Sequence, residues 1–223
     1  MKLVRAAEHI ENLEVAINAY FAGKWCTFAL SKDADGRYHF STTMHGEPQN
    51  YRLIVGDAIH NMRAALDFMA VELVTLNGKS GKSVYFPFSA DAASLDGAIK
   101  SKNFYKASGQ AVALLNATQP YRGGNDLLRA LHDLDIQDKH HKVEPSYCML
   151  STPAISVVRD SAGKPVGFDT GDLQLELDES QPPKAVMTFP ANGPLGNKSV
   201  LDELRAMHAL VTNIVDDFEA ICP

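Results

Sequence analysis

What this sequence of 223 residues lacks already excludes several chemistries. Its three cysteines, Cys26, Cys148 and Cys222, form no C-x-x-C pair, so we expect free, buried thiols in a reducing compartment rather than a zinc ribbon. No apolar run approaches the roughly 18 residues of a membrane-spanning helix. The charged start, Met1–His9, has no long apolar segment and does not resemble a signal peptide. We therefore expect a cytoplasmic protein without membrane contact.

Positive charge is also scarce. The chain carries 21 Lys and Arg against 27 Asp and Glu, a formal net charge of −6, with 45% hydrophobic residues. A protein that binds DNA in bulk normally presents a basic patch or stripe. The composition therefore predicts an ordinary globular protein without bulk DNA binding, although a local patch is still compatible with an RNA or nucleotide ligand.

Several nucleotide and hydrolase motifs are missing as well. The segment 78–83 contains G-K-S twice, but it lacks the upstream glycine of a P-loop and follows an expected helix rather than a strand. No G-x-S-x-G elbow and no H-E-x-x-H motif occur. We therefore predict no cofactor and no assigned metal ligand.

The patterns that are present predict one α+β domain over residues 1–223. Apolar residues recur at helical spacing over 3–22, 53–76, 126–142 and 200–221, with two shorter helices near 92–102 and 108–117. β-prone segments at 25–30 and 37–43 flank a turn and predict a hairpin. Later strands are expected at 147–159, 172–178 and 184–190, with a short strand-like piece at 84–88. The expected architecture is a core of four main helices, an N-terminal β-hairpin and a C-terminal β-meander before the last helix.

The helix expected at 53–76 is apolar on two sides. One side is wholly apolar, and the other mixes Leu53, Ala64, Phe68 and Val71 with polar side chains. A helix that is apolar all round is usually central and buried. We therefore expect its polar residues to be semi-buried and to need partners; they are Asp57, His60, Asn61, Arg63 and Asp67.

The helix expected at 126–142 has a similar character. Its apolar stripe of Leu127, Leu131 and Leu134 continues, at the same angular position, to Asp138. Asp138 is therefore expected to point inward, where an ionised carboxylate needs a cation or several donors. Arg63 or a histidine of the facing helix would meet that need. The residues expected to flank the stripe are His132, Asp135, Lys139 and His140.

Two strings in these helices resemble a family of uncharacterised bacterial proteins. The first, over 56–67, resembles the pattern G-D-x-x-H-N-x-R-x-A-L-D, and the second, over 131–141, resembles L-x-x-L-x-x-x-D-K-H-[RH]. With the connectors at 85–88 and 119–121, the resemblance covers about a third of the chain. It carries no established activity.

The chain is more remotely similar to the HEPN (higher eukaryote and prokaryote nucleotide-binding) domains, a group of helical folds. Many of these are metal-independent RNases with an R-x4-6-H motif. Here Phe68 occupies the position of that histidine, and no Arg in the chain is followed by His with four to six residues between. This departure weakens the RNase interpretation at its diagnostic residue.

Three functions and one structural alternative follow from these residues. The leading prediction is a HEPN-like binding or interaction protein with a polar network between two core helices. The second is an RNase or nucleotide-directed enzyme, in which His60 acts in acid–base chemistry with Asp57 or Asp138 orienting it. The third is a metal-dependent hydrolase on the same face, because Asp57 and His60, like Asp135 and Asp138, are three residues apart. The structural alternative is a satisfied network that only sets the register of the two helices.

These alternatives share one set of candidate residues. The catalytic candidates are His60, Arg63, Asp138 and His140. The candidates for binding or support are Asp57, Asn61, Asp67, His132, Asp135 and Lys139. A homodimer is the expected protein partner, since the last helix has a strong apolar face and HEPN-like domains often place their site at a two-fold interface.

Overall fold

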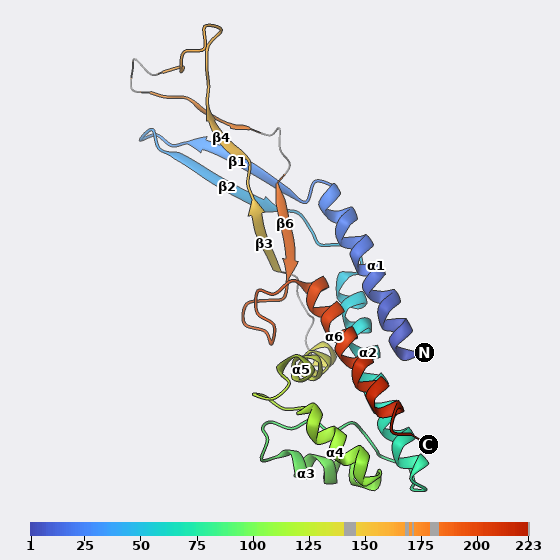
Figure 1. Ribbon diagram of the computed structural model, residues 1–223. Helices are drawn as coiled ribbons and strands as arrows, with labels where there is room; N and C mark the ends of the chain where they lie inside the picture. The colour runs from blue at the N-terminus through green and yellow to red at the C-terminus, as the bar shows by residue number, and fades with distance from the viewer. Residues whose placement is uncertain (141–145, 168–169, 171, 179–182, 223) are drawn as a thin grey trace. The chain divides into compact units, whose positions relative to one another are not determined.

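The computed structural model describes residues 1–140, 146–167, 170, 172–178 and 183–222, without the side chains of Lys139 and His140. It confirms the α+β class (Figure 1). The helices are α1 (Lys2–Ala22), α2 (Tyr51–Leu76), α3 (Leu95–Ser101), the 3-10 turn η1 (Phe104–Lys106), α4 (Gly109–Thr118), α5 (Asp126–His140) and α6 (Val200–Glu219). Each expected helix is present, and the last residues of the one expected at 126–142 lie outside the described residues.

The described strands form three separate two-stranded pairs rather than one sheet. They are β1 (Cys26–Lys32), β2 (Tyr38–Met44), β3 (Ser146–Ser151), β4 (Ala154–Val157), β5 (Leu175–Asp178) and β6 (Lys184–Thr188). Among them, β1 pairs with β2, β3 with β6, and β4 with β5. The expected hairpin is confirmed.

The prediction of a C-terminal β-meander is wrong. The β4–β5 pair is nested between β3 and β6 in the sequence, so β3 does not pair with β4 and β5 does not pair with β6, as a meander would require. The strand expected at 147–159 is interrupted at Thr152 and Pro153, because proline has no N–H to donate to a sheet. The short piece at 84–88 is also not a strand, although Ser89 forms an isolated bridge with Tyr121.

The chain divides into two compact units. The first consists of residues 1–16, 50–146 and 188–223, and the second of residues 17–49 and 147–187. The single domain expected over 1–223 stays a prediction.

Helix α2 lies at the centre of the first unit. One side of it is fully buried, including Val55, Ile59, Met62 and Leu66. It packs against α6 and α5, whose buried apolar residues complete the core (Figure 1). The packing confirms that the apolar stripe expected on this helix faces the interior.

The apolar face of α6 is covered within the chain. Its buried residues are Val200, Leu204, Met207, Val211, Ile214 and Phe218, and α6 makes its most extensive helix contact with α2. Helix α1 is tied to α6 by Arg205, whose Nη2 lies 2.6 Å from Glu14 Oε2, and by His208, whose Nε2 donates to the Leu3 carbonyl over 3.0 Å. The α6 face expected to form a dimer is therefore occupied.

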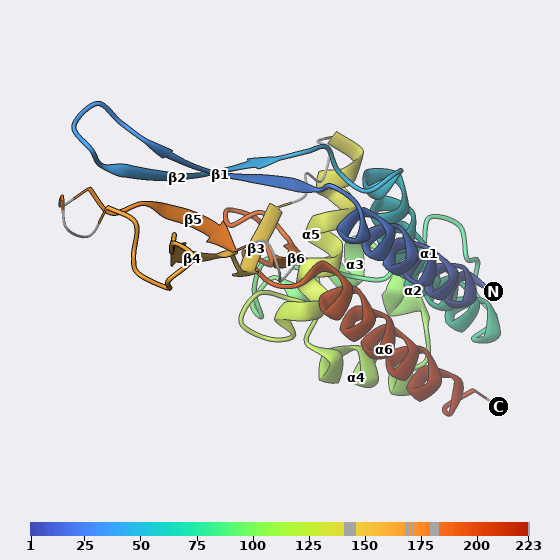
Figure 2. The same ribbon diagram turned by 90° about the horizontal axis from the view of Figure 1, so that it is seen from above.

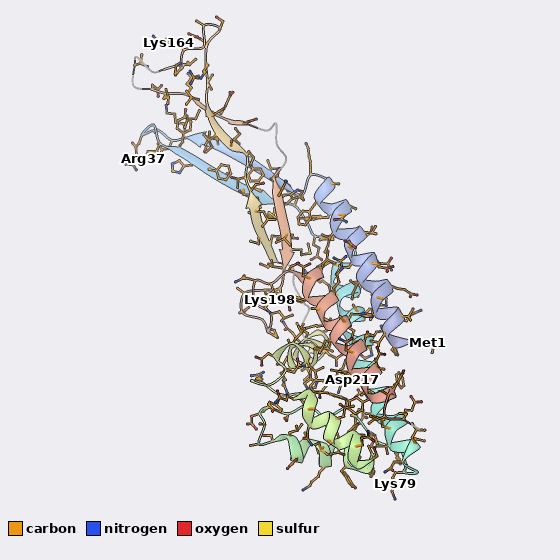
Figure 3. The ribbon with its side chains drawn as sticks, in the orientation of Figure 1. Met1, Arg37, Lys79, Lys164, Lys198 and Asp217 are labelled. Atoms are coloured by element: carbon orange, nitrogen blue, oxygen red, sulfur yellow. The ribbon has the colours of Figure 1, made fainter. Side chains whose placement is uncertain are left out.

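The second unit is built from ribbons with few buried residues. In the β1–β2 hairpin (Figure 2), Leu30 lies opposite Phe40, and the Phe28 and Phe40 rings stack with centroids 5.6 Å apart. The Tyr38 hydroxyl joins this hairpin to the next ribbon, because it donates to Leu173 O and accepts from Leu175 N, each over 3.0 Å. Arg37 lies beside the turn that joins β1 to β2 (Figure 3).

Two further expectations concern composition. No helix in the described part of the chain is both long and apolar enough to cross a membrane. The three cysteines are free, as expected, but they are not buried: Cys148 is exposed and the other two are partly exposed. Partial burial raises the pKa of the Cys26 thiol above its ordinary value.

Candidate functional site

The side of α2 opposite the core is left uncovered. Leu53 is 68% exposed and Phe68 is 60% exposed, and Asp57 and His60 between them are also exposed. With the partly exposed Asn61 and Ala64, these residues recur every three or four positions and form one stripe, which we call the outer face of α2. The expectation that Asp57 and His60 are semi-buried is therefore wrong, because the described parts of α5 and α1 reach only the margins of this side of the helix, through Asp135 and Lys2.

His60 is paired with a buried carboxylate of α5. Its Nδ1 lies 3.1 Å from Asp135 Oδ1, while the side chain of His60 is 55% exposed and that of Asp135 is 6% exposed. A carboxylate that accepts the Nδ1–H fixes the tautomer of the ring and leaves Nε2 as the other nitrogen. The pair therefore presents an oriented imidazole on the outer face of α2.

Arg63 lies on the buried side and holds a connecting segment. It is 8% exposed, and its Nη1 lies 2.6 Å from Asp67 Oδ1. Its Nη2 donates to the Phe86 carbonyl over 3.4 Å, while the Phe86 amide donates to Asp67 Oδ1 over 2.8 Å. Arg63 and Asp67 thus bind both backbone groups of Phe86, and their opposite charges are paired with each other.

The aromatic ring of Phe88 joins Arg63 to α5. The Arg63 guanidinium carbon lies 4.8 Å from the Phe88 ring centroid, a cation–π distance. The His132 ring stacks on Phe88 with centroids 4.4 Å apart and only 4° between the planes. His132 therefore belongs to the packing between α5 and the segment 86–89.

The environment of His132 favours its neutral form. Burial, together with the smaller effect of the positive charges of Arg63 and Arg129, lowers the pKa of His132 from 6.5 to about 4, against still smaller opposing effects of Asp133 and Asp135. His132 Nδ1 is buried and has no hydrogen-bond partner among the described residues. A proton on that nitrogen would lack an acceptor, which agrees with a neutral ring.

A second arginine pair anchors the same segment. Arg129 Nη1 donates to the Ser89 carbonyl over 2.8 Å, and its Nη2 lies 2.6 Å from Asp133 Oδ1. Arg122 approaches the other oxygen of Asp133 at 3.1 Å. The segment 86–89 is therefore held by one arginine from α2 and one from α5.

Asp138 does not point into the core as expected. The residue is exposed, and its carboxylate lies beside Gly56 of α2, where an added Cβ would be 2.6–2.8 Å from it. The buried face of α5 runs through Leu128, Leu131 and Asp135 rather than from Leu127 to Asp138. This one-position difference in the stripe makes Asp135 the inward carboxylate of the helix.

The remaining candidates fall around the outer face of α2 or outside the described residues. Asn61 accepts from Lys2 Nζ at its Oδ1 over 3.3 Å and donates from Nδ2 to the Asp57 carbonyl over 2.8 Å. The side chains of Lys139 and His140 lie outside the described residues. The structure thus joins His60 with Asp135, and Arg63 with Asp67, but does not bring all the candidates to one point.

Metal ligation finds no support in the described residues, since no group of three or more His, Cys, Asp or Glu among them could hold an ion.

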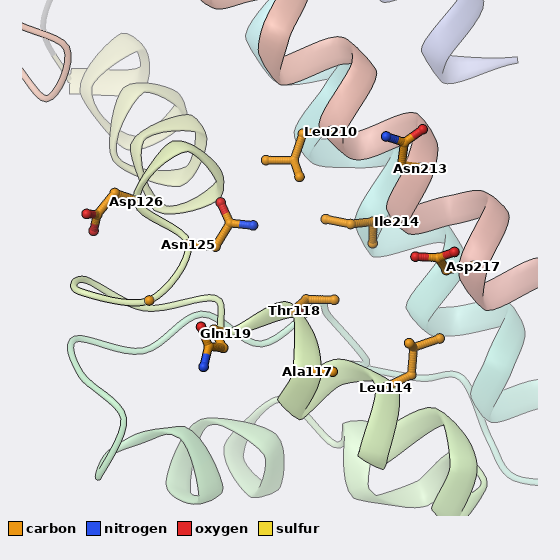
Figure 4. A pocket seen from close by; sticks show the side chains of 11 residues that line it. Leu114, Ala117, Thr118, Gln119, Asn125, Asp126, Leu210, Asn213, Ile214 and Asp217 are labelled. Atoms are coloured by element: carbon orange, nitrogen blue, oxygen red, sulfur yellow. The ribbon is translucent and has the colours of Figure 1, made fainter.

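A separate open pocket of about 480 Å³ lies between α4, the loop before α5 and α6 (Figure 4). Its lining includes Leu114, Gln119, Asn125, Asn213 and Asp217, and no residue of the predicted site.

Sequence reasoning missed Phe88 and Arg129. The i, i+4 spacing of Arg129 and Asp133 was a usable signal for an ion pair on a helix. Phe88 had no comparable signal, because its stacking on His132 depends on where a loop runs.

Comparison with protein-family models, with curated proteins and with solved structures finds no match to this chain.

Proposed function

We propose that this is an interaction protein that binds its partner through the outer face of α2. The observation that carries the proposal is the exposure of Leu53 and Phe68 on the most central helix of the first unit. Leu53 and Phe68 lie at the two ends of this face with Ala64 between them, and exposed apolar side chains that share one helix face are a common feature of protein–protein contacts. The oriented His60–Asp135 pair gives this face a polar centre.

The charges of the face favour a protein over a nucleic acid. Asp57 contributes a carboxylate, and Lys2 of α1 lies at its margin. Arg63 contributes nothing to it, because its guanidinium is buried and paired with Asp67. A phosphate backbone is normally bound by several Lys or Arg side chains. The remote similarity to HEPN domains remains an expectation that this proposal does not require.

The proposal is tested by photo-crosslinking in cells that express the full chain. p-Benzoylphenylalanine replaces Phe68 in one variant and Tyr105, a comparably exposed aromatic residue of η1, in the control. We expect a discrete protein adduct from position 68 and none from position 105. If position 68 gives no adduct, or both positions give the same adducts, the proposal is wrong.

A second candidate function is an acid–base enzyme acting on RNA or a nucleotide. The His60–Asp135 distance of 3.1 Å favours it, because a buried carboxylate orients the imidazole as in many catalytic pairs. Asp135 takes the orienting role expected of Asp57 or Asp138. Cleavage of a labelled single-stranded RNA that is lost in both His60→Gln and Asp135→Asn, but kept in His132→Phe, would favour this function. No cleavage by the wild-type protein would eliminate RNase activity.

A further inference from the structure

The outer face of α2 is self-complementary in an antiparallel arrangement. A register that sets Leu53 opposite Phe68 of the partner subunit also sets Asp57 opposite Ala64 of the partner subunit. The same register sets His60 opposite Asn61 of the partner subunit, so the two-fold axis passes between positions 60 and 61. Such a face meets the requirement of an isologous interface, in which each contact occurs twice.

The charges at the margin of the face fit the same register. Lys2 Nζ lies 3.3 Å from Asn61 Oδ1 and 5.9 Å from the Phe68 ring centroid, which places it beside the stretch between them, at the level of Ala64. In the antiparallel register this level faces Asp57 of the partner subunit. Asp57 is exposed, and no ion pair joins it to Lys2 within the described part of one chain. Two symmetric Lys2–Asp57 pairs would therefore form between subunits.

We propose that the partner of the outer face of α2 is a second copy of this chain, docked antiparallel with Leu53 on Phe68 and Lys2 on Asp57. This inference rests on the proposed function and names its partner. Leu53 and Phe68 are 15 residues apart, about 22 Å along the helix. A single helix face of that length, together with Lys2 at its edge, forms a small interface. We therefore expect a weak dimer, with a dissociation constant on the order of micromolar.

Sedimentation of the full chain from about 1 to 200 µM tests the inference. We expect a concentration-dependent dimer, weakened at least 10-fold by Leu53→Lys or Phe68→Lys. The matched controls are Val15→Lys and Tyr105→Lys, which alter comparably exposed apolar residues elsewhere and should leave association unchanged. Circular dichroism verifies that each variant is folded.

A charge exchange tests the register itself. Lys2→Glu and Asp57→Lys should each weaken the dimer, and the double variant K2E/D57K should restore it, because the opposite charges again meet across the two-fold axis. Restored dimer affinity in the double variant is specific to the Lys2–Asp57 pairing, because the affinity of a purely apolar contact would not depend on which of the two positions carries which charge. A dimer that is unaffected by any of these variants would overturn the inference.

Failure of this inference is distinguishable from failure of the proposed function. If the wild-type chain is monomeric throughout, while the residue-68 crosslink captures a different protein, the second copy is wrong and the interaction surface stands. If the crosslink captures nothing, both are wrong. An adduct of twice the 24.3 kDa chain mass, absent in K2E and restored in K2E/D57K, supports both.

Discussion

His132 shows how one buried side chain sets a pH response. Its ring is partly buried against Phe88 and lies near the positive charges of Arg63 and Arg129, so burial first and these charges second make the folded protein resist protonating it. The unfolded chain has no such restriction, and there the ring takes up a proton near its ordinary pKa of 6.5. The unfolded state is therefore favoured as the pH falls below that value.

We predict that stability decreases between pH 6.5 and about 4 because of this residue. The folded pKa is lowered, so the stabilising effect is complete above pH 6.5, is lost progressively on acidification, and changes no further below about pH 4. Allowing for partial exposure of the ring, the loss is about 1–2 kcal/mol. Urea unfolding at several pH values between 4.5 and 7.5 measures it.

The control is His132→Phe, which keeps an aromatic ring against Phe88 and removes the titration. Carboxylates such as Asp33 and Asp91, whose pKa values are lowered by hydrogen bonds, contribute equally to both proteins. The difference between the two curves therefore isolates His132. Parallel curves over this range would show that His132 is not the group responsible.

At this scale the sequence predicted residue types better than their pairings. It predicted that His60, Arg63 and Asp67 need partners, and the structure supplies Asp135 to His60 and pairs Arg63 with Asp67. It predicted the wrong inward carboxylate of α5, Asp138 instead of Asp135, because both positions are compatible with a helical stripe. The choice depends on how α5 is rotated against α2, which only the packing fixes.

At the scale of elements, helices were predictable and strand pairings were not. The boundaries of α2 and α6 follow from apolar spacing and local signals, and Asn125 caps α5 by accepting from the Leu128 amide over 3.0 Å. Strand pairing depends on distant partners, so the nesting of β4–β5 within β3–β6 had no local signal. The one usable sequence signal was Pro153, which predicts a break between two strands and lies between β3 and β4.

Two glycines should respond in opposite ways to alanine. In the loop before α5, a Cβ at Gly124 would lie 2.6 Å from Tyr121 Cε2 and 2.8 Å from the Gln119 carbonyl oxygen. We predict that Gly124→Ala lowers the free energy of unfolding by about 1–3 kcal/mol through this crowding. Gly97 in α3 has no such neighbour within 4 Å, so Gly97→Ala should raise stability by about 0.5–1 kcal/mol. Thermal unfolding of both variants measures the two effects, and equal shifts would contradict the packing described for the loop.

At the scale of the whole molecule, the two units differ in how much they bury. The first contains nearly all the fully buried apolar residues, whereas the ribbons β1 to β5 consist of partly or fully exposed residues. Two-stranded ribbons without a core are marginal in water. Stability should therefore be uneven along the chain.

We predict that backbone amides of β1 and β2 exchange with solvent at lower opening free energies than those of α2 and α6. The physical reason is the lack of buried apolar area that would be lost on local opening. Hydrogen exchange followed by mass spectrometry, with peptides from the two units compared in one sample, measures the difference. Equal protection of the hairpin and α2 would show that the chain opens as one cooperative unit.

The central claim is that the polar residues of α2 are divided between two tasks. Arg63 and Asp67 hold the fold together, whereas His60 and its neighbours form a surface that is available to a partner. A purely structural network would instead require His60 as much as Arg63.

The most direct test is the free energy of unfolding of His60→Gln compared with Arg63→Met. The glutamine amide introduced by the first variant still offers an N–H to Asp135, and His60 is exposed, so we predict a change within about 0.5 kcal/mol. Arg63→Met removes the buried partner of Asp67 and Phe86, and we predict a loss of about 2–4 kcal/mol. If both variants lose the same free energy of unfolding, the polar residues of α2 are not divided into a structural and a surface group, and His60 belongs to a structural network.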